Sequence, residues 1–141
     1  MSLLILRAGE IRQLLTMPDC VELMDRAMRA ASSGLVDMPP RIVAQVGAGA
    51  DYLFLMPGVV QEPLAYGAKL ISMLPVNPDM GRPAIQGFVT LFDGETGTAV
   101  AILEGGEITR IRTAATSALA SRELARDSAH THGILGAGLQ A

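Results

Sequence analysis

The sequence predicts an α+β fold, in which two helices precede a mostly antiparallel sheet and a further helix follows it. Apolar residues recur at helical spacing from about Gly9 to Gly34. From Arg41 to Leu103 the pattern changes to short segments rich in Val, Ile, Leu, Phe and Tyr, separated by Gly, Pro, Asp and Asn. Helical spacing returns from about Thr109 to Ala125. Helices grouped apart from antiparallel strands are typical of α+β domains.

The N-terminal region predicts a short strand and two helices. The strand is Leu3 to Leu6, and the first helix runs from about Gly9 to Leu15. Thr16 and Pro18 mark the start of the second helix, and Gly34 marks its end. One face of this helix repeats at helical spacing and is expected to be buried, so its cysteine is expected to be a core residue: Cys20, Met24, Ala27, Met28 and Ala31.

The middle of the chain predicts five strands: Arg41–Val46, Tyr52–Met56, Tyr66–Leu74, Gln86–Asp93 and Thr98–Leu103. The turn signal Asp-Gly-Glu-Thr-Gly at residues 93–97 predicts a hairpin between the last two. The segment 52–56 has no polar alternate, so both of its faces should be covered. In the last helix, Thr109 to Ala125, small residues would allow close approach to a neighbouring backbone.

The end of the chain, Gly133 to Ala141, predicts the first strand and phosphate-binding turn of a dinucleotide-binding domain. A short apolar run opens into G-x-G-x-x-A, in which Gly136 permits the tight turn and Gly138 lets the backbone approach a pyrophosphate. On this motif alone, a plain strand ending in a glycine turn is an equal alternative. The polar connector before it predicts a first domain over residues 1–127 and the start of an incomplete Rossmann domain over 128–141.

Composition narrows the function class. The net charge of -3 and the 4% aromatic content argue against a nucleic-acid partner. Apolar runs are too short for a membrane span or a signal peptide, so a cytoplasmic protein is expected. Cys20 is the only cysteine, which excludes an internal disulfide. His130 and His132 beside Asp127 are too few ligands for a typical metal site, so no metal is expected.

Three cations and one hydroxyl are the candidates for chemistry. Lys69 interrupts an apolar strand, where it either points into a cleft and binds a carboxylate or moves a proton, or lies on the solvated face. Arg41 opens a strand after two prolines, and its guanidinium suits a carboxylate, although an exposed edge arginine is equally common. Arg112 and Thr113 fall in the expected first turns of the last helix, where free amides could help to hold an anion; a surface arginine is the alternative.

The stretch from Glu107 to Ala118, E-I-T-R-I-R-T-A-A-T-S-A, followed by G-A-G-L-Q-A at residues 136–141, is the most specific pattern in the chain. Together they resemble the ornithine cyclodeaminase/mu-crystallin family, which includes ornithine cyclodeaminases, an archaeal type of alanine dehydrogenase and imine reductases. Further matching stretches cover the chain in order: Met38–Arg41, Leu55–Pro57, Gly67–Lys69 and Leu91–Gly97.

The resemblance implies a two-domain enzyme that passes hydride between NAD or NADP and the carbon bearing the amine or imine of an amino or imino acid. Arg41, Lys69 and Arg112 would surround the substrate carboxylate, with Lys69 catalytic. Arg112 and Thr113 would also lie near the cofactor. The pyrophosphate turn would contain Gly136, Gly138, Leu139 and Gln140. The 141-residue chain alone is expected to be inactive.

Two departures from the cyclodeaminase pattern favour a general amino-acid dehydrogenase or imine reductase. Phe54 replaces the glutamate of the Glu-Leu-Met-Pro motif, and Ala84 replaces a threonine after Pro83. The resemblance implies a homodimer formed by joined sheets, and the surplus of apolar strands over covering helices independently predicts self-association. The alternative function is a non-catalytic small-molecule-binding or dimerisation module of the mu-crystallin type.

Overall fold

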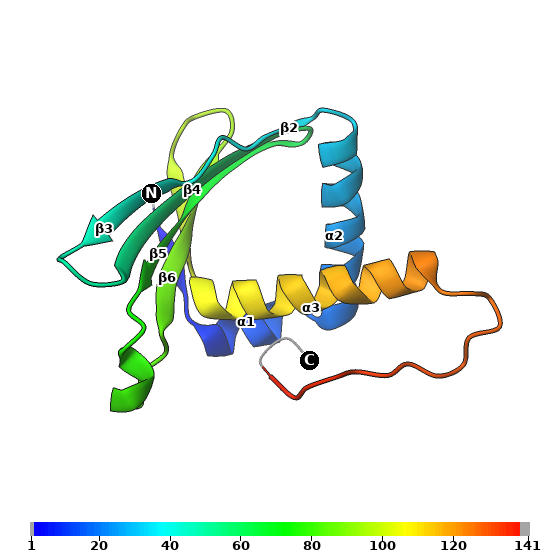
Figure 1. Cartoon of the computed structure of the whole chain (residues 1–141). Helices are drawn as coiled ribbons and strands as arrows, with labels where there is room; N and C mark the ends of the chain where they lie inside the picture. The colour runs from blue at the N-terminus through cyan, green and yellow to red at the C-terminus, as the bar shows by residue number, and fades with distance from the viewer. Residues whose placement is uncertain (1, 139–141) are drawn as a thin grey trace.

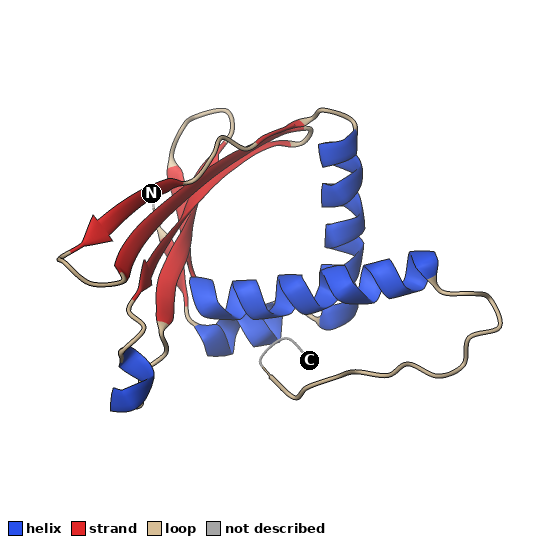
Figure 2. Cartoon of the chain, in the orientation of Figure 1, coloured by secondary structure: helices blue, strands red, loops and turns tan. Residues whose placement is uncertain are grey.

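The computed structural model describes residues 2–138; Met1 and residues 139–141 lie outside the described part. Within it, a mostly antiparallel sheet has three α-helices on one side, and its other side carries no layer (Figures 1 and 2). The predicted α+β class is therefore confirmed. The elements in chain order are β1 Leu4–Leu6, α1 Ala8–Leu14, α2 Met17–Ser32, β2 Val36–Asp37, β3 Ile42–Val46, β4 Asp51–Gln61, β5 Leu64–Met73, η1 Asn77–Met80, β6 Ile85–Asp93, β7 Ala99–Glu104 and α3 Gly105–Leu124.

The sheet has the strand order β1-β7-β6-β5-β4-β2, with β3 also paired to β4. Among the described strands, only β1 and β7 pair in parallel, and every other pair is antiparallel. All the predicted strands of the first 127 residues form. β4 extends beyond its predicted end at Met56, through Pro57 and Gly58. Pro57 is tolerated there because β4 lacks a partner on its outer edge between β3 and β2. The short β2 and η1 carry no alternating pattern and were not predicted.

The first half of α2 forms the helical core, and its second half does not. Thr16 caps the helix by accepting a hydrogen bond from the Asp19 amide at 3.3 Å. Cys20 packs with Ile111 of α3 and is 2% exposed, which confirms it as a core residue. The predicted burial of Ala27, Met28 and Ala31 is wrong: all are exposed, Met28 by 47%. α3 crosses α2 near the N-terminal end of α2, so none of the described helices covers the later turns of α2 (Figure 1).

α3 begins at Gly105, one turn before the predicted start at Thr109. The Glu104 carboxylate caps it, accepting hydrogen bonds from the amides of Gly106 at 2.8 Å and Glu107 at 2.6 Å. The double glycine at the start of α3 permits close contact with the sheet. A Cβ on Gly105 would lie 2.8 Å from the carbonyl carbon of Gly87 in β6. The first turn of α3 therefore rests directly on the backbone of the sheet.

The sheet face that points away from the helices is apolar and uncovered. Cross-strand partners place Ile42, Leu55, Leu70 and Phe88 in one row across β3, β4, β5 and β6. Ile42 is 60% exposed and Phe88 39%. Leu53, on the same face of β4 as Leu55, is also exposed. The expectation that segment 52–56 is covered on both faces is therefore wrong for the chain by itself, because the helices cover one face alone.

The segment after α3 contains neither helix nor strand up to residue 138. The strand predicted over Gly133 to Leu135 is therefore not formed, because none of the described strands lies beside it to take its backbone hydrogen bonds. Leu135 is fully exposed. Gly136 does adopt a left-handed φ of 103°, as a glycine turn requires. No helix among the described residues has the length and apolar character needed to cross a membrane.

Candidate functional site

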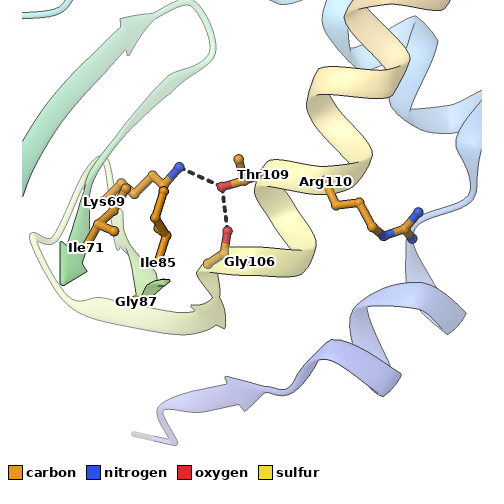
Figure 3. Close-up of a pocket in the computed structure, with 8 residues that line it drawn as sticks. Lys69, Ile71, Ile85, Gly87, Gly106, Thr109 and Arg110 are labelled. Atoms are coloured by element: carbon orange, nitrogen blue, oxygen red, sulfur yellow. Dashed lines mark hydrogen bonds between the residues drawn. The ribbon is translucent and has the colours of Figure 1, made fainter. Parts of the chain in front are cut away.

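Lys69 lies in a pocket of about 230 Å³ between the sheet and the first turn of α3. The pocket is lined on the sheet side by aliphatic residues, Ile71 of β5 and Ile85 of β6, and by the bare backbone of Gly87 (Figure 3). Antiparallel register puts Lys69 opposite Val89, on the face that the helices cover. Lys69 therefore points into a cleft and not onto a solvated face, while its role there stays a prediction.

Thr109 holds the end of the Lys69 side chain. The Lys69 ammonium donates a hydrogen bond from Nζ to Thr109 Oγ1 at 2.6 Å, and the Thr109 hydroxyl donates to the Gly105 carbonyl, also at 2.6 Å (Figure 3). The hydroxyl proton is thus engaged by the helix backbone, and the oxygen lone pairs face Lys69. Because an ammonium carries three N–H donors, two remain for other acceptors.

The environment lowers the pKa of Lys69 below its usual value. Burial among the pocket's apolar atoms is the larger cause, because it penalises the charged form. The positive charge of Arg112 is the second cause. This coupling brings two of the sequence-predicted site residues, from β5 and α3, into one electrostatic environment. An anion between them would relieve the repulsion that both now experience.

Arg112 and Thr113 lie about two turns into α3, beyond its first-turn amides. The expectation that free amides join them in an anion site is wrong, because α3 starts earlier and Glu104 occupies its first amides. Instead, the buried hydroxyl oxygen of Thr113 has no hydrogen-bond partner among residues 2–138. A buried hydroxyl without a partner is uncommon in folded proteins, so Thr113 is a position where a bound group could supply the missing acceptor.

Arg41 lies on the same sheet face as Lys69, two strands away. Ile42, the next residue, pairs with Leu55 of β4, so Arg41 lies level with Met56. Met56 in turn pairs with Lys69 of β5. Two strand spacings put the backbones roughly 10 Å apart. The Arg41 guanidinium stacks over the Phe54 ring, 5.7 Å from its centroid. This contact holds the exposed Arg41 side chain over the helix-facing side of β4.

Glu107 has a structural role for which its sequence pattern gives no signal. Its carboxylate is buried, with 5% of the side chain exposed, and pairs with Arg12 of α1 at 2.9 Å and with Arg110. Figure 3 shows that Arg110 points away from the Lys69 pocket. Hydrogen bonding from Arg110 is the main cause that lowers the pKa of Glu107, and it outweighs burial. The three side chains fasten α3 to α1 beside the pocket.

The remaining predicted residues are not brought to this site. Gly136 and Gly138 belong to the irregular segment after α3, where a Cβ would meet no atom within 4 Å. Leu139 and Gln140 lie outside the described residues. No group of three or more potential metal ligands exists within residues 2–138. Lys69 and Arg41 thus share the helix-facing side of the sheet, and Arg112 of α3 is close enough to Lys69 to affect its pKa. The glycine turn does not line the Lys69 pocket.

Comparison with known proteins now decides the family. All of residues 1–141 match the family model described as the ornithine cyclodeaminase/mu-crystallin family. The chain belongs to the ornithine cyclodeaminase/mu-crystallin family. A curated member, Delta(1)-pyrroline-2-carboxylate reductase of Bacillus cereus, is 34% identical over 139 residues, which are 99% of this chain and 43% of that protein. The chain therefore spans less than half the length of this relative.

Solved members of the ornithine cyclodeaminase/mu-crystallin family share the fold. Thermococcus litoralis Delta(1)-pyrroline-2-carboxylate reductase, in complex with NADH and L-proline, superposes with a TM-score of 0.86 and 31% identity, covering 98% of this chain and 43% of that one. An archaeal alanine dehydrogenase dimer with bound NAD gives a TM-score of 0.88 and 29% identity, covering 99% and 42%. The similarity thus extends over nearly the whole of this chain.

Proposed function

We propose that this chain is the substrate-binding and dimerisation part of an NAD(P)-dependent enzyme that transfers hydride at the amine- or imine-bearing carbon of an amino or imino acid. The observation that carries the proposal is Lys69, an ammonium held in an apolar pocket with its pKa lowered and the Arg112 charge nearby. Two mutually repelling cations beside such a pocket favour binding of a carboxylate. The two solved relatives with bound NADH or NAD agree with this class of reaction.

In this proposal Lys69 and Arg112 bind the substrate carboxylate, and Arg41 approaches it from the edge of β4. Arg112 can supply a planar pair of donors, whereas the ammonium of Lys69 is a compact charge with donors left after its bond to Thr109. The lowered pKa of Lys69 also makes its ammonium a better proton donor to the substrate nitrogen than an ordinary surface lysine. Lys69 is therefore our candidate catalytic residue.

Arg112 and Thr113 are also our candidates to contact the cofactor from the α3 side. The unpartnered Thr113 hydroxyl supports this, because a phosphate or amide oxygen would satisfy it. The nicotinamide, when bound, supplies or accepts the hydride. Gly136 and Gly138, with Leu139 and Gln140 beyond the described part, are proposed for the pyrophosphate turn on sequence grounds.

The nature of residue 54 favours a dehydrogenase or reductase over a diamino-acid cyclodeaminase. A glutamate at this position would offer a carboxylate on the helix-facing side of β4, suited to a second amino group. The chain has Phe54, whose ring lies under the Arg41 guanidinium. An aromatic ring under a guanidinium leaves this side of the site without an anion of its own, which suits a substrate that is charged mainly at its carboxylate.

We further propose that the apolar outer face of the sheet joins a second copy of the chain. Ile42, Leu53 and Phe88 are exposed there, and a contiguous apolar patch on a protein surface often marks an interaction site. The archaeal alanine dehydrogenase is a dimer.

The proposal is tested by assaying the protein that contains this chain and its cofactor domain. Consumption of NADH or NADPH with cyclic and acyclic imino acids, and reduction of NAD or NADP with amino acids, would both be followed at 340 nm. Turnover in either direction supports the enzyme. Saturable binding of these compounds without turnover would instead support a binding module of the mu-crystallin type.

A further inference from the structure

We infer that Thr109 is a positioning residue that fixes the Lys69 ammonium in the pocket and favours its charged form. The effect of Thr109 on catalysis rests on the proposed function. Its hydrogen bond to Lys69 does not, because it is part of the fold. Thr109 is the side chain in α3 that accepts a hydrogen bond from Lys69. Nothing in the catalytic roles proposed above requires this hydroxyl to touch the substrate.

The first reason is the direction of the hydrogen bonds. The Thr109 hydroxyl donates its one proton to the Gly105 carbonyl at 2.6 Å, so toward Lys69 it acts as an acceptor. An ammonium donates a stronger hydrogen bond to a neutral acceptor than a neutral amine does. The hydroxyl therefore opposes the burial and the Arg112 charge, which both lower the pKa of Lys69.

The second reason is how the hydroxyl is held. Gly105 contacts the backbone of Gly87 so closely that a Cβ would clash, which sets the distance between the first turn of α3 and β6. Thr109 stands one turn along and hydrogen-bonds back to this same Gly105. The position of the hydroxyl is thus determined by the same sheet that carries Lys69. No loop lies between the two groups in this chain of contacts.

The third reason is the geometry of α3. Thr109, Arg112 and Thr113 are spaced at i, i+3 and i+4 and so lie on one face of the helix. This face presents a hydroxyl to Lys69 and, one turn further, a guanidinium and a second hydroxyl. By fixing Lys69 relative to this face, Thr109 sets the spacing of the two cations that we propose for the carboxylate.

Lys69 is the only lysine in the sequence, so its pKa can be measured directly. In the chain labelled with ¹³C-lysine, the side-chain Cε signal of a single residue would be titrated by NMR. We expect Thr109→Val to lower the pKa of Lys69 below that of the wild type and Thr109→Ser to restore it. Thr109→Ala, which deletes the hydroxyl without a bulky replacement, serves if the valine variant does not fold.

Thr116→Val is the matched control. Thr116 makes the same kind of bond to the helix backbone, from Oγ1 to the Arg112 carbonyl at 2.7 Å, but has no lysine partner. It should leave the pKa of Lys69 unchanged. An unchanged pKa in both the Val and Ala variants of Thr109, or an equal fall in the Thr116 variant, would overturn the inference even if the enzyme proves active.

In the active protein, Thr109→Val is expected to reduce kcat/KM by about ten- to hundredfold, the range for a hydrogen bond to a charged group. The alkaline limb of its pH profile should move to lower pH, because Lys69 loses its proton more easily. Thr109→Ser should recover most of the activity. A loss without any movement of that limb would contradict the role of Thr109 in the charge of Lys69. If no substrate is turned over by the wild type, the proposed function fails, while the NMR titration still decides the inference.

Discussion

Lys69 Nζ lies 2.6 Å from Thr109 Oγ1, which connects the middle of β5 to the second turn of α3 across 40 residues of sequence. The contact holds the ammonium in a pocket lined by Ile71 and Ile85, close enough to Arg112 for its charge to lower the pKa of Lys69. A lysine on a solvated strand face would have neither the partner nor the lowered pKa. The candidate site is therefore a consequence of how α3 docks on the sheet.

Removal of the Arg112 charge should raise the pKa of Lys69. Arg112 disfavours the ammonium by like-charge repulsion, so Arg112→Met relieves one of the two causes that lower this pKa. The same NMR titration of the single lysine measures the change. Arg126→Met removes an exposed cation beyond the end of α3 and should leave the pKa as in the wild type. A fall, or no change, in the Arg112 variant would show that the two groups are not coupled.

Glu107→Gln should lower the free energy of unfolding by about 2 kcal/mol, since it weakens charged hydrogen bonds to Arg12 and Arg110 around a buried carboxylate. Urea denaturation at pH 7 measures it. Asp25→Asn is the control: its ion pair with Arg29 lies on the surface and should contribute nothing measurable. Equal stability of the Glu107 variant and the wild type would contradict the proposed fastening of α3 to α1.

The stabilisation by Glu107 should also depend on pH. The pKa of Glu107 is lowered in the folded chain, so the carboxylate contributes stability above the unfolded pKa of about 4.3. This contribution should be lost as the pH falls through the lower folded value. Thermal denaturation between pH 7 and pH 3 should therefore bring wild type and Glu107→Gln together at the acidic end. Curves that stay parallel would argue against a lowered pKa.

The chain should form a dimer through the outer face of the sheet. Light scattering at micromolar concentration is expected to give twice the 14.8 kDa mass of one chain. Phe88→Lys introduces a charge on that face and should produce monomers. Leu124→Lys, at the 83%-exposed end of α3, should leave the dimer intact. A monomeric wild type would refute this interface.

The 141-residue chain should bind NADH weakly by itself. Residues 133–138 form no strand, so the glycine turn is not supported by a sheet. A fluorescence titration of NADH is expected to show no saturation in the micromolar range. Micromolar affinity would mean that Arg112, Thr113 and neighbouring residues make a more complete cofactor site than we infer.

Local patterns were sufficient to predict most of the fold. The strands and the start of α2 follow from short-range alternation and capping, which need no knowledge of distant contacts. The start of α3 did not follow, because its double glycine looks like a loop until the contact between Gly105 and Gly87 is known. The predicted strand ends at Met56, before Pro57, whereas β4 continues through it. The missing partner on the outer edge of β4, which tolerates a proline, is a property of the whole sheet.

The site was predicted only in part, because some of its residues act through contacts that are distant in the sequence. Lys69 was identifiable because a lone cation in an apolar strand is unusual, but Thr109 and Glu107 look like ordinary helix residues in the sequence. Their roles come from partners 40 and 95 residues away. The expected strand at residues 133–135 does not form, although the run is apolar. An apolar run forms a strand only when neighbouring strands complete its backbone hydrogen bonds.

The most direct test of the proposed function is the activity of Lys69→Met in the protein that carries its cofactor domain. Methionine keeps the apolar stem of the side chain and deletes its charge, so the melting temperature should hardly change. Loss of a partner to a desolvated carboxylate costs about 2–5 kcal/mol, which corresponds to a loss in kcat/KM of roughly thirtyfold or more.

Wild type and variant would be compared with NADH and NADPH and several imino acids, with Arg82→Met as a surface control. Our account predicts turnover by the wild type and the control, and the stated loss in the Lys69 variant at unchanged stability. Equal kcat/KM in wild type and Lys69→Met would contradict it.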